Sequence, residues 1–213
     1  MSLAPPFSRR DTEVLERSTA FQGFFRLDRL RLRHRLYEGD WSPELVRELF
    51  VRNPAVAVLP WDPARDEVLL VEQFRVGALD HRDNPWCLEL IAGIADREGE
   101  PREDLVRRES REEAGIELGD LLPLPSYLAS PGGSNERLYP FLAIADLREA
   151  SGIHGHPEEG EDIRVVKVPV ARLQAVLDAG TLDNAPALVA VQWLLLHHAE
   201  LKARYGEPGE MSR

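Results

Sequence analysis

Three glutamates in one short segment have the spacing that metal chemistry requires. Glu109, Glu112 and Glu113 are separated by three and four positions, so a helix would place them on one face. Glu109 and Glu113 would then be like charges one turn apart, which costs an ordinary helix roughly 0.2–0.5 kcal/mol. A hard cation would offset this cost, because Mg²⁺ prefers oxygen ligands and shares them between carboxylates and substrate phosphates. The spacing therefore predicts a metal site that serves phosphate chemistry.

The ends of this helix can also be predicted from the residues. Pro101 suits the first turn of a helix, and Gly115 suits its C-terminal stop. Within the helix, Arg108 and Glu112 are four positions apart and can form an ion pair. The competing interpretation is a solvated, charged surface helix in which this pair is the main feature.

The stretch from Gly93 to Ile116 resembles the Nudix box, the signature of hydrolases that act on nucleoside diphosphates linked to another group. Two positions depart from the family pattern. Six residues rather than five separate Gly93 from Glu100, and Ser110 stands where the family prefers an apolar residue. The positions that fit are Glu100, Arg108, Glu109, Glu112, Glu113, Gly115 and Ile116. The resemblance implies that Glu109 and Glu113 bind metal, that Glu112 binds it directly or through water, and that Arg108 orients these carboxylates.

A wider resemblance, to bacterial ADP-ribose pyrophosphatases, covers roughly residues 20–200 and includes Glu161-Asp-Ile-Arg-Val, Asp183-Asn-Ala and Gln192-Trp-Leu. It implies hydrolysis of the pyrophosphate bond of ADP-ribose to AMP and ribose 5-phosphate, with two or three Mg²⁺ or Mn²⁺ ions per site. It further implies that Glu159 accepts the proton from water, and that Glu161 and the Ala92 carbonyl complete the metal ligands. Glu158 and Asp162 lie close enough in sequence to compete with Glu159 and Glu161 for these roles.

The same resemblance implies a set of substrate contacts. Guanidinium groups suit diphosphate oxygens and flat bases, and an aromatic pair suits an adenine ring. The aromatic pair would come from the partner subunit of a swapped homodimer. The alternative is that these residues have no role in binding: the arginines would be solvated, the aromatic pair would belong to the core, and residues 130–133 would form a plain turn. The implied contacts are Phe24, Phe25, Arg47, Glu48, Arg52, Arg75, Ile94, Ser130, Pro131, Gly132 and Glu136.

The elements that must position these residues follow from the apolar pattern. Residues 21–38 alternate apolar and polar, which predicts two or three antiparallel strands ending near Gly39 and Asp40. Residues 1–20 read as a polar lead-in, and Pro43–Leu49 as a short turn or helix. Further strands are expected at 55–59, 67–74, 86–92 and 163–168, with two more within 121–147, and helices at 170–179 and 185–204.

This mixture of strands and helices predicts an α/β protein, a three-layer α/β/α sandwich. With the resemblance, we expect the Nudix sandwich with a mixed sheet, plus a small N-terminal antiparallel β-sheet arm. The expected organisation is an arm over residues 1–50, swapped in a dimer, a Nudix hydrolase domain over 51–205 and a tail over 206–213.

Composition excludes several classes of function. The net charge of −11 argues against a nucleic-acid partner, which needs basic surface. No apolar run is long enough to span a membrane, and the N-terminus lacks the apolar core of a signal peptide. The single cysteine, Cys87, favours a reducing cytoplasm. A phosphate-bearing substrate would be repelled by this charge unless metal ions and arginines compensate locally.

Two other functions stay open. The first is the same chemistry on another nucleoside diphosphate sugar, because the box binds only the shared diphosphate. The second is a non-catalytic ADP-ribose-binding module, which typically lacks some box carboxylates, whereas all are present here. Mg²⁺-dependent release of AMP would separate an enzyme from such a module.

Overall fold

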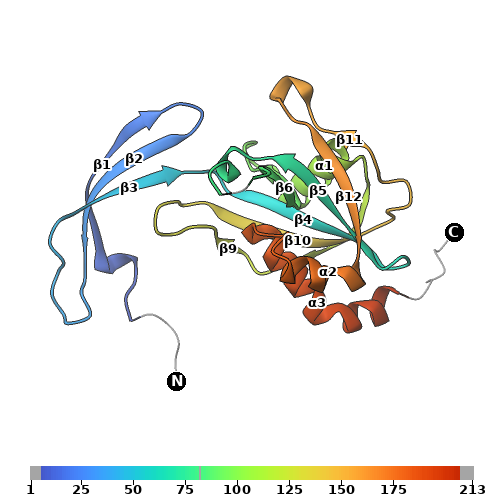
Figure 1. The fold of residues 1–213 in the computed structure, drawn as a ribbon. Coiled ribbons are helices and arrows are strands. Elements are labelled where there is room, and N and C mark those ends of the chain that lie inside the picture. The colour runs from blue at the N-terminus through green and yellow to red at the C-terminus, as the bar shows by residue number, and fades with distance from the viewer. Residues whose placement is uncertain (1–5, 82, 207–213) are drawn as a thin grey trace. The chain divides into compact units, whose positions relative to one another are not determined.

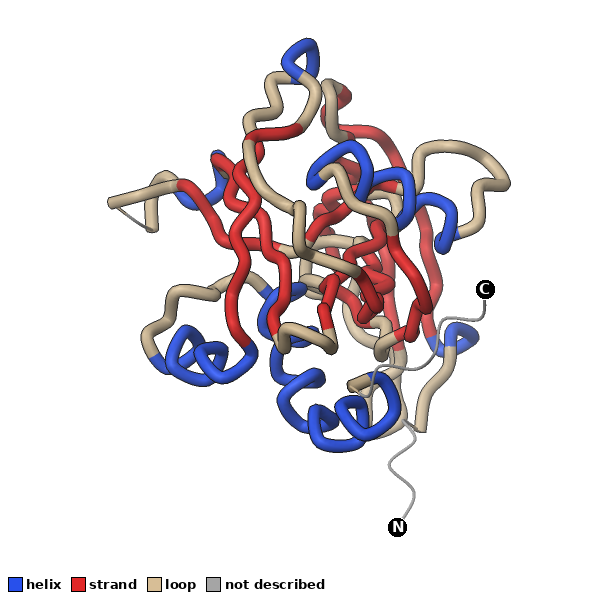
Figure 2. The backbone as a smooth tube through the Cα atoms, turned by 90° about the vertical axis from the view of Figure 1, so that its right-hand side faces the viewer, coloured by secondary structure: helices blue, strands red, loops and turns tan. Residues whose placement is uncertain are grey.

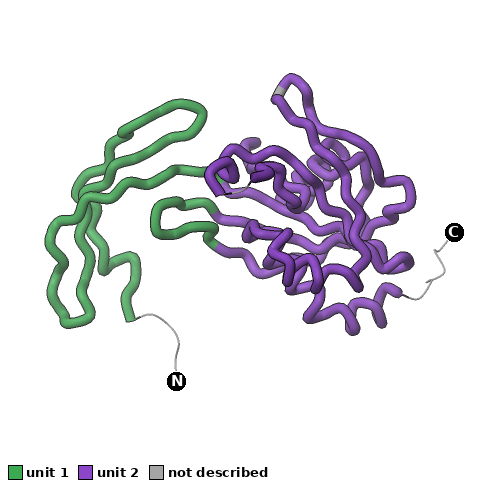
Figure 3. The backbone as a smooth tube through the Cα atoms, in the orientation of Figure 1, with its two compact units in different colours: residues 1–53, 128–136 green, residues 54–127, 137–213 purple. Residues whose placement is uncertain are grey.

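The computed structural model describes residues 6–81 and 83–206, with the side chain of Glu159 excepted. The chain divides into two compact units (Figure 3). The first contains residues 1–53 and 128–136, and the second contains residues 54–127 and 137–213. None of the described helices has the length and apolar character needed to cross a bilayer. Beyond Gly206, the predicted tail lies outside the described residues.

The first unit is a three-stranded antiparallel sheet in the order β1–β2–β3 (Figure 1). Its strands are β1 (Thr12–Gln22), β2 (Arg26–His34) and β3 (Leu45–Val51), after a short 3-10 helix at Arg9–Asp11. The predicted N-terminal antiparallel sheet is therefore confirmed. Two local predictions are wrong: β1 occupies most of the expected polar lead-in, and β3 replaces the turn or helix expected at Pro43–Leu49.

Cross-strand ion pairs explain why β1 was missed. Glu13 and Glu16 on β1 pair with Arg33 and Arg31 on β2, with closest nitrogen–oxygen distances of 2.6 and 2.8 Å. Charged residues therefore occupy positions where the apolar member of a strand pattern is expected. Pairing of opposite charges across an antiparallel ladder stabilises the sheet without producing an apolar alternation.

The described part of the first unit has no apolar core of its own. Among residues 6–53 and 128–136, the only buried side chains are Asp28 and Ser42. Asp28 forms ion pairs with Arg17 at 2.6 Å and Arg26 at 3.1 Å. A three-stranded sheet normally requires a packed apolar face for independent stability.

The second unit is a nine-stranded mixed sheet between helices. Its main path is β11–β12–β5–β4–β10–β8, with β6 paired to β5, β7 to β4 and β9 to β10. β4 and β10 run parallel to each other, whereas the pairs β10–β8, β11–β12, β12–β5, β4–β5, β4–β7 and β5–β6 are antiparallel. The strands are β4 (Ala55–Asp62), β5 (Glu67–Phe74), β6 (Trp86–Glu89), β7 (Ile91–Ile94), β8 (Leu118–Pro123), β9 (Tyr127–Leu128), β10 (Arg137–Ala145), β11 (Ile153–His154) and β12 (Ile163–Pro169).

Helices cover both faces of this sheet, as Figures 1 and 2 show. The helix α1 (Arg102–Ala114) packs on one face, where Leu105 joins a cluster with Val71. The helices α2 (Val170–Asp178) and α3 (Ala185–Tyr205) pack on the other, where Leu194 joins a cluster with Leu70. Successive residues of a buried strand point to opposite faces, so β5 contributes to both layers. The predicted α/β/α sandwich is confirmed.

One correction affects the site directly. The single strand expected at 86–92 is two strands, β6 and β7, which separate at Leu90. β6 pairs with β5, whereas β7 pairs with β4. Glu89 and Ala92 therefore belong to different strands, although only two residues separate them.

The box helix ends where its sequence predicts, and it begins at Arg102, directly after the proline that was expected in its first turn. Pro101 is its N-terminal cap residue, and Gly115 is its C-terminal cap in the left-handed conformation, with φ of 64°. A glycine adopts this conformation without steric cost. Ser110, the departure from the family pattern, is fully buried, and its hydroxyl donates to the Val106 carbonyl at 2.8 Å. The helix itself therefore satisfies the polar group that replaces an apolar one.

Candidate active site

The carboxylates of α1 lie against β7. The Ala92 N–H donates to Oε2 of Glu113 at 3.2 Å. A Cβ atom on Gly93 would lie 2.4 Å from Cγ and Oε1 of Glu109, so only glycine permits this approach. The N–H and C=O of a residue in an antiparallel strand point to the same side. The Ala92 carbonyl is therefore on the side of β7 where Glu113 lies.

Arg108 holds the remaining box carboxylates together. Its Nη1 lies 2.9 Å from Oε1 of Glu109 and 3.0 Å from Oε2 of Glu112. Its Nε lies 3.3 Å from Oε1 of Glu100. Burial acts to lower the pKa of Arg108, but these three carboxylates raise it above its ordinary value. The guanidinium therefore stays charged and restrains the side chains around it.

The loop between β11 and β12 carries Glu161 to the same site. The Gly155 N–H donates to the Glu112 carbonyl at 3.3 Å, which ties this loop to α1. Oε2 of Glu161 accepts a hydrogen bond from the His156 N–H at 3.1 Å. A Cβ atom on Gly155, where φ is 98°, would lie 2.8 Å from Cβ of Glu161. Gly155 therefore permits both the left-handed turn and the close approach of Glu161.

The competing acids of this loop have different surroundings. Glu158 and Asp162 are exposed. Glu159 ends the 3-10 helix at Pro157–Glu159, and its side chain lies outside the described part of the chain. Its role as proton acceptor therefore stays a prediction.

Burial and mutual repulsion raise the pKa values of Glu109 and Glu113, the two metal-ligand candidates of α1. Burial, followed by the charges of Glu112, Glu161 and Asp96, raises the pKa of Glu109 to about 7, although Arg108 opposes this. Burial, followed by the charges of Glu109 and Glu161, raises the pKa of Glu113 to about 8, against the Ala92 hydrogen bond and Arg75. Three carboxylates thus share an electrostatic cost that protonation or a cation relieves.

These residues fit a divalent cation by chemistry and charge. The donors are carboxylate oxygens and one backbone carbonyl, which hard cations prefer. Within residues 6–81 and 83–206, no three His, Cys, Asp or Glu side chains already enclose a common metal position. The carboxylates would therefore have to turn toward the ion, and Glu109 would have to share its contact with Arg108.

The metal-free protein is expected to lose stability as pH rises from about 4.5 to about 8. In this range the unfolded chain has released the protons of Glu109 and Glu113, whose ordinary pKa is 4.5, while the folded protein retains them. The free energy of unfolding therefore falls with pH. Urea denaturation in EDTA at several pH values measures this slope. Glu113→Gln should reduce it, and an unchanged slope in that variant would contradict the assignment.

Arg75 and Ile94 adjoin this group. Arg75 follows β5, its Nε donates to Oε2 of Glu89 at 2.8 Å, and its charge acts on Glu113. Ile94 is exposed at the end of β7. Sequence reasoning missed Glu89, because no local spacing relates it to Arg75.

Other predicted substrate contacts form a second cluster, within the first unit. Arg52 lies 3.1 Å from Oε1 of Glu136, and its guanidinium carbon lies 4.5 Å from the ring centre of Phe25. Phe24 packs edge-on against Phe25 at 4.7 Å and is 90% exposed. Phe50, which sequence reasoning missed, packs on Phe25 at 5.0 Å. Phe50 could have been identified if β3 had been predicted as a strand, because Phe50 then pairs with Leu27 on β2, close in sequence to Phe25.

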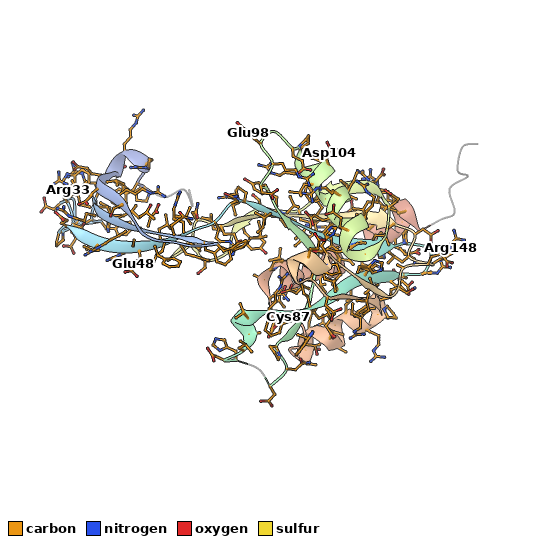
Figure 4. All side chains as sticks on the ribbon, turned by 90° about the horizontal axis from the view of Figure 1, so that it is seen from above. Arg33, Glu48, Cys87, Glu98, Asp104 and Arg148 are labelled. Carbon is orange, nitrogen blue, oxygen red and sulfur yellow. The ribbon has the colours of Figure 1, made fainter. Side chains whose placement is uncertain are left out.

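The remaining candidates surround this cluster in sequence. Arg47 and Glu48 are exposed on β3, where Figure 4 labels Glu48. Ser130, Pro131 and Gly132 form an exposed turn. The Gly133 carbonyl accepts the Phe50 N–H at 2.8 Å, so the turn lies beside β3.

Comparisons with known proteins agree on one family. The NUDIX domain model matches residues 51–208. The "ADP-ribose pyrophosphatase" of Escherichia coli strain K12 is 46% identical over 201 residues, covering 94% of this chain and 96% of that protein. The protein of the same name from Haemophilus influenzae is 42% identical, covering 95% and 94%.

More distant relatives differ in name. The "GDP-mannose pyrophosphatase" of Enterobacter sp. strain 638 is 29% identical over 70% of this chain and 76% of that protein. A solved structure titled "Crystal structure of ADP compounds hydrolase" superposes with a TM-score of 0.68 at 21% identity, covering 94% of this chain and all of the other. At this identity, the superposition supports the fold alone.

Proposed function

The chain belongs to the Nudix family, and from this premise we propose that it hydrolyses the pyrophosphate bond of ADP-ribose to AMP and ribose 5-phosphate. The observation that carries the proposal is the intact carboxylate group. Beside β7, the negative charge of Glu161 acts on both Glu109 and Glu113. The choice of ADP-ribose as substrate is supported by two relatives named "ADP-ribose pyrophosphatase", each more than 40% identical over nearly the whole chain.

Glu109, Glu113, Glu161 and the Ala92 carbonyl would hold two or three Mg²⁺ or Mn²⁺ ions. Bound cations supply positive charge to the diphosphate and lower the pKa of a bound water. Arg108 holds Glu109 and Glu112 in place through its ion pairs with both carboxylates.

The other residues act on the water and the substrate. Glu159 would accept the proton from the attacking water. Arg75 would bind diphosphate oxygens, as a guanidinium fork does well. Phe24, Phe25, Arg52 and Glu136 would receive the adenine, because an exposed aromatic ring beside a guanidinium offers a stacking surface. Arg47, Glu48, Ile94 and the turn at Ser130, Pro131 and Gly132 would complete the substrate contacts.

We propose a homodimer in which the arm, residues 1–50, packs on a second copy. Leu30, Leu32, Leu45 and Leu49 are only half-buried, and they lie on one face of a sheet without an apolar core. Covering this face would supply the packing that three strands require. Light scattering should give twice the chain mass, and Leu30→Arg with Leu32→Arg should give monomers. A wild-type monomer at micromolar concentration would refute the dimer.

A substrate panel tests the activity. ADP-ribose and other nucleoside diphosphate sugars, including GDP-mannose, are assayed with Mg²⁺, and both products are identified by mass. We expect ADP-ribose to have the highest kcat/KM and to yield AMP and ribose 5-phosphate. A higher kcat/KM for another sugar would reassign the substrate. ADP-ribose binding without AMP release would indicate a binding module.

A further inference from the structure

Glu89 is a carboxylate that the proposed reaction does not use. It ends β6, and its side chain is only 16% exposed. Its ladder partner on β5 is Val71, which packs in the cluster beneath α1. Paired residues share a face of the sheet, so Glu89 lies on the face where Glu113 lies. A further buried negative charge near carboxylates that already repel one another is costly unless a positive charge compensates it.

The compensation is Arg75, and the geometry of the contact is specific. Oε2 of Glu89 accepts a hydrogen bond from Nε of Arg75 at 2.8 Å. Among the described residues, Nη1 and Nη2 of Arg75 have no hydrogen-bond partner, and the side chain is 45% exposed. The backbone of Arg75 is also held, because its N–H donates to the Pro85 carbonyl at 3.0 Å. Both terminal nitrogens are therefore available to an anion.

This arrangement suits a diphosphate. A guanidinium presents two terminal nitrogens in one plane, and they can bind two oxygens at once. Fixing the group through Nε removes rotational freedom that would otherwise be lost when the substrate binds. Glu89, which holds the guanidinium, precedes Ala92 by three residues, and the Ala92 N–H donates to Glu113 of the predicted metal site. The charge of Arg75 also acts on Glu113.

We propose that Glu89 is a positioning residue: it fixes Arg75 through Nε, so that both terminal nitrogens face the diphosphate of the substrate. The identity of that substrate rests on the proposed function. Glu89 itself touches neither the substrate nor the metal ions.

A double-mutant cycle tests the proposal. Glu89→Ala is expected to raise KM for ADP-ribose about tenfold, with kcat changed less than about threefold, because ground-state and transition-state binding are lost together. Glu89→Gln should recover most of this loss, since its amide oxygen can still accept from Nε. Arg75→Ala should raise KM at least as much. The double variant Glu89→Ala/Arg75→Ala should be no worse than Arg75→Ala alone, because Glu89 acts through Arg75.

Glu72 provides a matched control. It forms an ion pair with Arg164 through two hydrogen bonds of 2.8 and 3.2 Å, on the same strand as Val71. Its side chain points to the opposite face, where Leu70 packs beneath α3. Glu72→Ala should leave KM unchanged. Mn²⁺ binding without substrate, followed by electron paramagnetic resonance, should be the same in wild type and Glu89→Ala.

Three results would overturn the proposal. They are an unchanged KM in Glu89→Ala, fully additive effects in the double variant, and weaker Mn²⁺ binding, which would make Glu89 a metal ligand. Failure of the proposed function is a separate outcome, seen as no turnover of ADP-ribose by the wild type. The same four proteins of the cycle are then compared by calorimetric binding of ADP with Mg²⁺. The same non-additivity in the dissociation constants is expected there, and additive losses would reject the role of Glu89.

Discussion

Replacing Glu113 with glutamine is expected to lower kcat for ADP-ribose hydrolysis by a factor on the order of 10³, while the protein stays folded. Glu113 is 6% exposed, and glutamine has nearly the same shape. The amide oxygen can still accept the Ala92 N–H, so the contact between α1 and β7 is retained. The substitution removes the negative charge that a divalent cation requires, and Glu109 and Glu161 alone would hold it less tightly.

Steady-state kinetics over a range of Mg²⁺ concentrations measures this effect, and circular dichroism measures the fold. Glu117→Gln is the matched control, because Glu117 lies just beyond the C-terminus of α1, is 76% exposed and pairs only with Arg111 in the described part of the chain. Its kcat should stay within about twofold of wild type, as expected for a surface ion pair. Near-wild-type hydrolysis by Glu113→Gln would remove Glu113 from the metal site.

Replacing Glu161 with glutamine is expected to lower kcat by a factor on the order of 10² or more. The negative charge of Glu161 raises the pKa of both Glu109 and Glu113. A cation bound between these carboxylates would therefore interact with all three. The His156 N–H can still donate to the glutamine side chain, so the loop should keep its conformation. High Mg²⁺ should partly restore the rate, because the loss is one of cation affinity.

The neighbouring acid Asp162 gives the comparison. It is exposed and follows Glu161 directly in the chain. Asp162→Asn carries the same change of charge and should leave kcat within about twofold of wild type. If Asp162→Asn lost activity and Glu161→Gln kept it, the metal-ligand role would pass from Glu161 to Asp162.

Local patterns predicted local structure well. The helix α1 ends at Gly115 as expected, and Arg108 pairs with Glu112, because capping and four-residue spacing depend only on nearby residues. The strands of the sandwich were also predictable, since β4 is buried along its whole length and reads as an apolar run. The same reasoning failed for β1, where charged residues pair across the ladder and hide the alternation.

Contacts between distant residues were not predictable from spacing. Arg52 and Glu136 are far apart in the chain, and they meet because the turn at 130–136 lies beside β3. Arg75 and Glu89 meet because β6 turns back along β5. The family resemblance had indicated Arg52, Glu136 and Arg75 individually. It carried no information about Glu89 or Phe50, or about which of these residues touch.

The sequence by itself determined that three carboxylates share one helix face, because helical periodicity is a property of consecutive residues. It also determined where that helix ends. Only the tertiary structure decided that Glu113 is buried against β7, that Glu161 acts on it from another loop, and that Arg75 is held by Glu89. Burial and charge proximity set the pKa and the cation affinity of a carboxylate, and both arise when distant segments pack together.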